Sequence, residues 1–371
     1  MTPETSQSER GREVTAPPGS DSSPRRPARR LTVLAVVALV LITAGVVVWQ
    51  RSDNGTGPGS SPTPVQNVPS AVRAYRAFEP NSWWNTPLPA YTPLDPAGDQ
   101  ILDYLRSGKS SGLGCLTLAG AGSSPWGTPI YWGGPGDPSY NVHGIHNGRP
   151  PELGSLRIPV SAEPANNSDG TMIVYDRAKG YVAALTDAKY HPATDTWSAS
   201  GGTVTYLHSN GLNVNTGRSD DPRNTGTHRG NNGATMAASW DQVQAGAIRH
   251  VLKVAVGPEL ADRFVFPMVG SDGNYRGTDP KVPPEGLRLR IKASVNLNAL
   301  HLSPEALIIA RALQRYGFYI GDSAGATALK LENTAAEGRG QLWHLSTDAL
   351  CGLPFKPQYW DVVAEGYDPT Q

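Results

Sequence analysis

An uncharged apolar run near the start of the chain constrains its organisation more than any other feature. The run is Leu31–Trp49, and it contains no charged residue. At about 1.5 Å per residue, a helix of this length covers about 28 Å, close to the ~30 Å hydrocarbon core of a bilayer. Backbone groups in lipid must be paired within the segment, so a helix is the form expected. Residues 31–50 are therefore predicted to cross the lipid bilayer once.

The charges that flank this run predict its orientation. Several arginines lie between residues 25 and 30, whereas Arg51 alone follows the run directly. The positive-inside bias then places the N-terminus in the cytoplasm and the C-terminal part outside the cell, as in a single-pass protein of the cell membrane. The other interpretation is a cleaved signal peptide. We favour the anchor, because the run is longer than a usual signal core and ends without a small-residue cleavage pattern.

The segments around the run differ sharply in composition. Residues 1–30 are rich in Ser, Pro, Glu and Arg with almost nothing apolar, so we expect a disordered cytoplasmic tail. Residues 51–70 are rich in Gly, Ser and Pro and are typical of a flexible linker. Residues 71–371 are then expected to form one extracytoplasmic β-rich domain.

The overall composition excludes some partners and favours a loop-rich domain. Lys and Arg total 32 and Asp and Glu total 32, so the formal net charge is zero. A neutral chain lacks the basic surplus of a nucleic-acid binder. Phosphate-binding and dinucleotide signatures are also missing, so we expect no nucleotide partner and no cofactor. The 41 glycines and 33 prolines favour a domain with many turns.

Two cysteines, Cys115 and Cys351, lie on the expected outer side. An oxidising exterior favours a disulfide between them, and such a long-range link would restrict the unfolded chain. The alternative is two buried free thiols. Two thiols alone do not favour a structural zinc site, so no metal is expected.

From residue 171 onward the pattern changes to short runs with a period of two. Such runs, separated by turn residues, are typical of β-strands. They indicate a mainly β fold, a β-sandwich or jelly-roll-like domain with a few short helices. The expected strands are Thr171–Tyr175, Gly180–Leu185, Thr203–Leu207, Ile248–Val256, Phe264–Met268, Leu287–Ile291 and Phe318–Ile320.

Two segments show helical spacing instead. Asp99–Ser107 places Ile101, Leu102 and Leu105 on one side of a short helix. The second segment begins with Ser303 as N-cap and Pro304 at the first helical position, and its apolar residues recur on one face until Gly317 ends it. These two segments are the helices that the sequence predicts most clearly.

Four sequence motifs carry a resemblance to a known family. They are Trp83–Thr86, Gly246–Leu252, Pro284–Ser294, and Ala312–Gly317 with the Asp-Ser pair that ends at Ser323. Through these motifs, residues 75–330 resemble a widespread, functionally uncharacterised family of secreted or membrane-anchored bacterial proteins. The resemblance implies one extracytoplasmic domain rather than two. It carries over no catalytic residue, because no reaction is established for the family.

Acidic residues in the loops supply candidates for hydrolysis. A glycoside hydrolase needs two carboxyl groups on either side of the scissile bond. The candidate catalytic residues are Glu152, Asp169, Asp187 and Asp272. Asp169 and Asp272 each stand in a Ser-Asp-Gly triplet, so the formation of turns is the alternative interpretation.

Aromatic and basic residues supply candidates for ligand binding. A tryptophan ring can stack on a sugar ring, and an alternating row of arginines on a strand can bind an acidic glycan. The candidate substrate-binding residues are Trp132, His143, His146, His228, Arg229, Arg288 and Arg290. Core packing of the tryptophan, solvation of the loop histidines and pairing of the arginines with acids on neighbouring strands remain the alternatives.

The expected location and fold class together favour a polysaccharide ligand. We expect a membrane-anchored protein that binds or hydrolyses a polysaccharide of the cell envelope or the environment. The alternative is a non-catalytic scaffold or protein-interaction domain of the envelope. Whether the chain is an enzyme stays open at this point, because folds do not fix functions.

Overall fold

The computed structural model describes residues 68–371 apart from residue 147. The expected cytoplasmic tail, the transmembrane segment 31–50 and nearly all of the linker 51–70 lie outside these described residues, so these expectations stay predictions. Among the described helices, none combines the length and apolar character that crossing a membrane requires.

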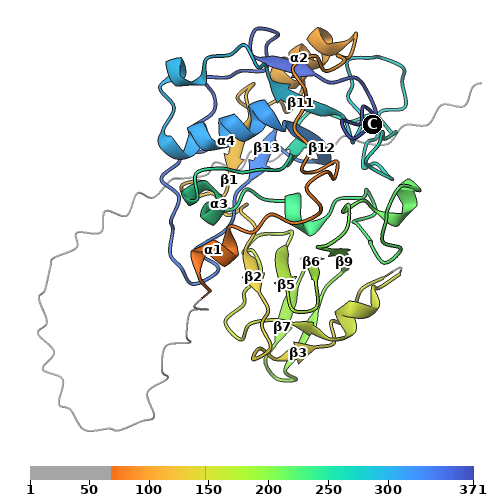
Figure 1. The fold of residues 1–371 in the computed structure, drawn as a ribbon, viewed down its shortest axis with the longest axis vertical. Coiled ribbons are helices and arrows are strands. Elements are labelled where there is room, and N and C mark those ends of the chain that lie inside the picture. Colours follow the sequence, from red (N-terminus) through yellow and green to blue (C-terminus); the bar gives the residue numbers. More distant parts are fainter. Residues whose placement is uncertain (1–67, 147) are drawn as a thin grey trace, which may run out of the picture. The chain divides into compact units, whose positions relative to one another are not determined.

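The larger of the two main sheets is a mixed sheet of six strands, of which Figure 1 labels β1, β11, β12 and β13. Strand β10 pairs in parallel with β12, and β1 pairs in parallel with β13, while the other pairs in this sheet are antiparallel. Every residue of β10 is buried, as expected for a central strand. In spatial order the strands are β1 (Thr117–Ala119), β13 (Ala328–Lys330), β10 (Leu252–Val256), β12 (Phe318–Ser323), β11 (Arg288–Ile291) and β14 (Trp360–Val362).

A second sheet has four strands. Strand β5 continues into β6 through the turn between Asp176 and Gly180, where the Gly180 amide donates to the Asp176 carbonyl at 2.8 Å. Its strands are, in order, β2 (Ile130–Trp132), β5 (Met172–Asp176), β6 (Tyr181–Thr186) and β9 (Gly201–Tyr206). Two short hairpins add β3 (Ser139–Tyr140) with β4 (Leu156–Arg157), and β7 (Lys189–His191) with β8 (Thr196–Ser198).

Helix α4 (Pro304–Arg315) packs on strand β11 and begins as the sequence predicts. The Ser303 hydroxyl accepts a hydrogen bond from the Ala306 amide, and Gly317 ends the segment with a φ of +73°. The expected helix at residues 99–107 is also confirmed as α2 (Gly98–Ser107). The remaining helical turns are α1 (Ser70–Arg73), α3 (Trp240–Gln244), η1 (Pro151–Gly154), η2 (Val214–Thr216), η3 (Gly233–Thr235) and η4 (Leu297–Leu300).

An aromatic layer joins the two sheets. Trp83 and Trp84 make edge-to-face contacts with each other and with Tyr319 of β12. The same buried cluster includes Trp132 and Tyr175 of the four-stranded sheet, which stack with their ring centres 4.4 Å apart. Since each buried aromatic side chain removes about 150–250 Å² from water, this layer is a major part of the core.

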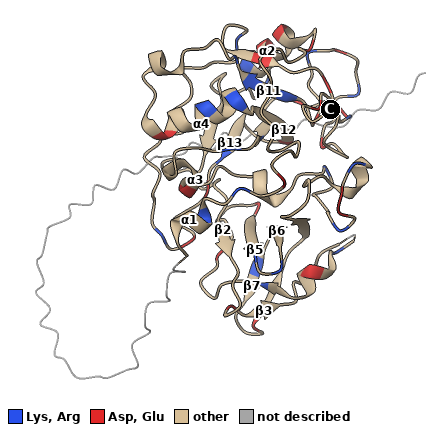
Figure 2. Ribbon diagram, viewed as in Figure 1, with Lys and Arg blue, Asp and Glu red and all other residues tan. Residues whose placement is uncertain are grey.

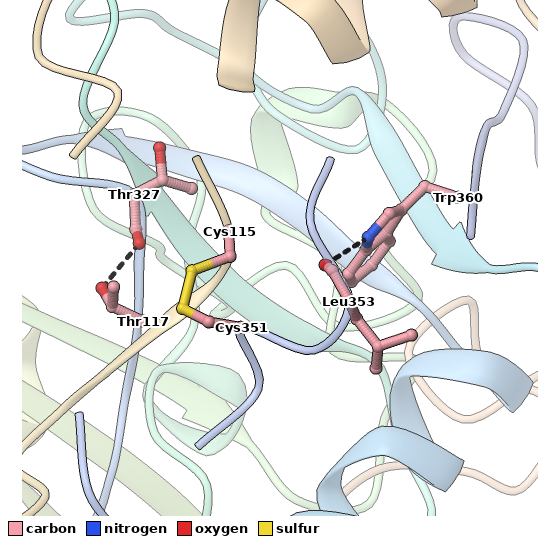
Figure 3. Close-up of a disulfide and its surroundings, with 6 residues drawn as sticks. All are labelled: Cys115, Thr117, Thr327, Cys351, Leu353 and Trp360. Carbon is pink, nitrogen blue, oxygen red and sulfur yellow. Dashed lines mark hydrogen bonds between the residues drawn. A yellow bond between two sulfur atoms is a disulfide. The ribbon is translucent and has the colours of Figure 1, made fainter. Parts of the chain in front are cut away.

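The expected disulfide is confirmed. Cys115 and Cys351 are bonded, with their Cα atoms 5.1 Å apart (Figure 3). The bond closes a loop with a sequence separation of 236 residues. Nearby, the Thr117 hydroxyl donates to the Thr327 carbonyl at 2.7 Å, which fastens β1 to the chain just before β13. In the loop-entropy model, closing so long a loop stabilises the fold by about 5–6 kcal/mol.

The expectation of a mainly β domain with few helices is confirmed, but the strand directions are more varied than in a jelly roll. A jelly roll is built from antiparallel strands, whereas three of the pairs described above, including β2 with β5, are parallel. The expected strand at Phe264–Met268 is absent from the fold. There, Phe264 makes only an isolated bridge to Glu285, and Pro267 has no amide to donate to a ladder.

Acidic and basic residues are interspersed over both sheets rather than separated between them (Figure 2). This mixing agrees with the zero formal net charge of the chain. Several charged side chains are nevertheless buried, and two of them, Lys253 and Glu285, belong to the candidate site described next.

Candidate functional site

Five charged side chains meet beside strands β10 and β12, and we call them the Arg229 cluster. The Nη1 atom of Arg229 contacts the carboxylates of both Asp272 and Asp322, the latter at 2.9 Å. The Lys253 ammonium donates to Asp322 at 2.7 Å. Glu285 completes the cluster, with its Oε2 atom 4.0 Å from Arg229 Nε.

The fold brings these residues together from distant parts of the chain. Lys253 and Asp322 lie on the neighbouring parallel strands β10 and β12. Arg229 lies in a turn closed by a hydrogen bond from the Gly230 amide to the Thr227 carbonyl.

The buried Asn231 fastens this turn to strand β12, because its side-chain amide donates to the Gly321 carbonyl at 2.7 Å. Gly321 must be glycine, since a Cβ atom there would lie 2.3 Å from the Asn231 side-chain oxygen. The turn that carries Arg229 is therefore held in place against the sheet.

Burial changes the proton affinity of the cluster. Glu285 is 0 % exposed, and this burial raises the pKa of its carboxyl to about 7 despite the nearby Arg229. Burial also lowers the pKa of the Lys253 ammonium, an effect that Asp322 opposes. For Asp322, burial alone raises the carboxyl pKa, but the two cations outweigh it and hold the pKa below its usual value. Strongly perturbed groups beside a cavity are a feature of functional sites.

Two cavities lie on either side of the Arg229–Asp322 ion pair. We call the first the Asp322 cavity; its volume is about 460 Å³. We call the second the His228 cavity; its volume is about 620 Å³, and Arg229 is part of its lining. One member of the ion pair thus lines each cavity. Both volumes fall in the ~300–1,000 Å³ range of ligand sites.

The Asp322 cavity has small apolar walls and a few converging polar groups. Its lining includes Ser323, Trp126 with 42 % of its surface exposed, and the ion pair of Asp169 with Lys330 at 3.0 Å. Alanines and glycine make up most of the remaining wall. The arrangement offers an aromatic face together with two carboxylates that accept hydrogen bonds.

Three of the residues proposed from the sequence come together here. His228 and Arg229 both contact the carboxylate of Asp272, with His228 Nε2 at 2.5 Å. Asp272 thus holds two basic side chains in place. Its own amide donates to Glu285 at 3.2 Å, so the Ser-Asp-Gly turn is part of the cluster.

The other carboxylates proposed from the sequence lie in different parts of the structure. Asp169 lines the Asp322 cavity, and its carbonyl accepts the Asp187 amide at 2.7 Å. The Asp187 carboxylate is exposed and pairs with Lys189 at 2.8 Å. Glu152 accepts a hydrogen bond from the Tyr206 hydroxyl at 2.7 Å. Neither Asp187 nor Glu152 lines one of the two cavities.

The two histidines proposed in the Gly-rich loop, His143 and His146, also lie in different surroundings. His146 lines the His228 cavity. His143 is exposed, and its backbone pairs with the edge of β8, where its amide donates to the Trp197 carbonyl at 2.9 Å. Within the described ranges, no group of three or more His, Cys, Asp or Glu side chains is arranged to hold a metal ion.

The structure corrects the expectation of a cationic row that faces a ligand. Arg288 and Arg290 are each 3 % exposed. Arg288 donates to the Tyr316 carbonyl at 2.6 Å, and Arg290 binds Asp361 of the neighbouring strand β14 at 3.1 Å. Both side chains thus bind groups inside the protein, and the alternative of pairing across strands describes Arg290. Arg288 binds carbonyl oxygens only, and its buried Nη1 atom has no hydrogen-bond partner among the described residues.

Trp132 likewise belongs to the core rather than to a ligand surface. It is 6 % exposed and stacks on Tyr175 in the aromatic layer between the sheets. Its place on the short buried strand β2 leaves no face for a sugar ring.

Sequence reasoning missed three members of the cluster, the buried Lys253 and Glu285 and the partly exposed Asp322. Lys253 interrupts the apolar run of β10, and a lysine inside such a run signals a buried and partnered charge. Glu285 follows two prolines shortly before β11, and Asp322 ends the apolar part of β12. Only the fold shows that these three residues meet.

Comparison of the chain with protein-family models, with curated proteins and with solved structures finds no match. The resemblance to a family of secreted bacterial proteins therefore stays a prediction, and the function has to be argued from the site.

Proposed function

We propose that this chain is a membrane-anchored extracytoplasmic protein whose folded domain binds a cell-envelope or environmental polysaccharide in the Asp322 cavity. The observation that carries the proposal is that the Trp126 ring and the carboxylates of Asp169 and Asp322 line one cavity. A sugar ring has an apolar face and a rim of hydroxyl groups. An indole ring can pack against the apolar face of the sugar, and carboxylates can accept hydrogen bonds from its hydroxyl groups.

Both carboxylates are held in fixed positions, which favours a site formed in advance of binding. Lys330 holds Asp169 at 3.0 Å, and Lys253 holds Asp322 at 2.7 Å. The lowered pKa of Asp322 keeps it ionised, so it accepts hydrogen bonds rather than donating one. A site that needs little rearrangement loses less conformational freedom when the ligand binds.

Cleavage of the polysaccharide is the second candidate, and one observation favours it. The pKa values of Glu285 and Asp322 are moved in opposite directions, as in a pair made of a general acid and an ionised partner. However, Glu285 is fully buried and lines neither cavity. We therefore propose binding ahead of hydrolysis. A non-catalytic envelope scaffold is the competing function, and it predicts no affinity for glycans.

The test combines a glycan array with an assay for released reducing ends, both on the purified full-length chain. We expect binding to one class of polysaccharide, and a loss of at least tenfold in affinity for Trp126→Ala. Tyr91→Ala is the matched control, because Tyr91 is 98 % exposed and lines neither cavity. A blank array with no released ends, or equal affinity for both variants, would rule out this site as a glycan site.

The proposed location has a separate test. Its support is the apolar run 31–50 with arginines on its N-terminal side. A reporter enzyme fused after Gln371 and active only outside the cytoplasm should be active in intact cells. Recovery of a soluble protein with a new N-terminus beyond Trp49 would contradict the anchor.

A further inference from the structure

The His228 cavity differs from the Asp322 cavity in charge. Its ionisable lining side chains are all basic, namely His146, His228 and Arg229, and no Asp or Glu contributes to its wall. The carboxylates that hold Arg229 lie away from this wall, since Asp322 lines the other cavity and Asp272 lines neither. Of the cluster, only Arg229 lines this cavity, although Asp272 contacts both Arg229 and His228 from outside the wall.

The wall of the cavity also carries polar side chains, of which Asn213 already accepts the Asn215 backbone amide through Oδ1 at 2.8 Å. Thr203 of β9 is buried and lines the cavity, yet its hydroxyl has no hydrogen-bond partner within the described residues. A buried hydroxyl without a partner is costly, so such groups in native proteins call for an explanation. The side-chain amides of Asn213 and Asn215 lie on the same wall.

Arg229 is fixed in a way that suits recognition of an anion. Asp272 and Asp322 both contact its Nη1 atom, so that end of the guanidinium is anchored before a ligand arrives. The side chain is 13 % exposed and is part of the cavity wall. A guanidinium held in this way binds carboxylates with little further loss of side-chain freedom.

We propose that the His228 cavity is a second subsite, which binds a carboxylate-bearing sugar of an acidic polysaccharide. This inference rests on the proposed function and names its substrate class. Arg229 and His228 face the sugar carboxylate, while Thr203 and the asparagine amides bind the hydroxyls of the ring. Because one member of the Arg229–Asp322 pair lines each cavity, two units of the same glycan chain can be held on either side of that pair.

The experiment compares three ligands by calorimetry on the full-length chain at constant salt. The probes are an oligogalacturonate, the same oligomer as its methyl ester, and a neutral galactose oligomer of equal length. We expect the acid form to bind at least tenfold more tightly than its ester. His228→Glu should remove most of that preference, because it places a carboxylate on the wall of the cavity at a side chain that is 67 % exposed.

Matched variants distinguish the effect of a charge in the cavity from a general effect on folding. His208→Glu introduces the same charge at an exposed histidine that lines neither cavity, and we expect it to keep the preference. Thr203→Val removes the buried hydroxyl while nearly preserving the side-chain volume, and we expect a loss of several-fold for all bound glycans. Equal binding of acid and ester would overturn this inference but leave the proposed function standing. Binding of none of the three, together with a blank glycan array, would overturn both.

Discussion

Two partly buried arginines in this structure, Arg229 and Arg339, are surrounded by acids, and the difference between their surroundings separates a structural network from a candidate site. Arg339 binds Asp241 and Glu332 at 2.9 Å each and Glu337 at 3.2 Å. We call these four residues the Arg339 cluster. The Arg229 cluster also places three acids around an arginine, but it contains Lys253 as a second cation, and its acids make different contacts.

In the Arg339 cluster, each acid also binds a group outside the cluster. Glu332 accepts the Trp240 amide at 2.7 Å, Glu337 accepts the Ile130 amide at 2.8 Å, and Asp241 accepts the Ser70 hydroxyl at 2.7 Å. These bonds connect α1, α3 and β2. The Arg339 cluster therefore acts as a junction between elements of the fold.

Hydrogen bonding is incomplete in both clusters. In the Arg339 cluster, Asp241 Oδ2 has no hydrogen-bond partner among the described residues, but it lies 2.9 Å from the Arg339 guanidinium. Glu285 Oε2 and Arg229 Nε are buried and have no hydrogen-bond partner in the described part of the chain. Asp272 and Asp322 remain partly exposed, and the cluster borders two cavities. Glu337 of the Arg339 cluster also lines a cavity, so the contrast rests on the two partly exposed acids of the Arg229 cluster, which water and a ligand can reach.

The sharpest test of this comparison is to remove each arginine. Arg339→Met leaves three buried carboxylates without their shared cation, and we expect it to lower the free energy of unfolding by about 3–5 kcal/mol. Arg229→Met should cost less, about 1–3 kcal/mol, because Lys253 still pairs with Asp322 and water reaches the partly exposed acids. Chemical denaturation of both variants measures the difference. Equal losses would mean that both clusters are structural.

The second test uses the proton on Glu285. Its folded-state pKa of about 7 lies above the reference value of 4.5, so the folded state keeps a proton that the unfolded state loses between these values. Stability from this group is full below pH 4.5 and is lost as the pH rises through 7. The loss amounts to roughly 2–3 kcal/mol.

Glu285→Gln removes this titration. We therefore expect the difference in unfolding free energy between pH 5 and pH 8 to shrink by that amount relative to the unmodified chain. Denaturant unfolding at the two pH values provides the measurement. An unchanged pH dependence would show that Glu285 is already ionised in the folded protein, and the contrast between the clusters would weaken.

The smallest expected change in unfolding free energy follows from removing a hydrogen bond at the edge of the Arg339 cluster. Ser70→Ala removes the hydroxyl that binds Asp241 and should lower the unfolding free energy by about 1 kcal/mol. Ser107→Ala is the matched control, because its hydroxyl binds the Asp103 carbonyl in an exposed setting, and we expect almost no change. If both variants were equally stable, α1 would not depend on this junction.

The sequence predicts the local elements well, because their signals lie within a few residues. The hairpin of β5 and β6, the N-cap at Ser303 and the stop at Gly317 follow from turn and cap chemistry that neighbouring residues determine. The direction in which two strands pair is not determined by neighbouring residues in this way. An alternating pattern identifies a strand but not its partner, so the parallel pairing of β10 with β12 was not predictable.

The same limit applies to the site. The alternation of Arg288 and Arg290 correctly places both on one face of a strand, but Asp361, which binds Arg290, lies 71 residues further along the chain. Lys253 and Asp322 are 69 residues apart. His228, Arg229 and Asp272 were proposed as separate candidates, and only the folded chain joins them around a shared carboxylate.

The disulfide between Cys115 and Cys351 has a consequence for survival in a protease-rich setting. Both cavities and both arginine clusters are built mainly from the segment that this bond encloses. A single cut in an exposed turn of that segment yields two pieces that stay covalently joined. Such a nicked molecule keeps its halves at high local concentration, so the sheets can remain paired until the bond is reduced.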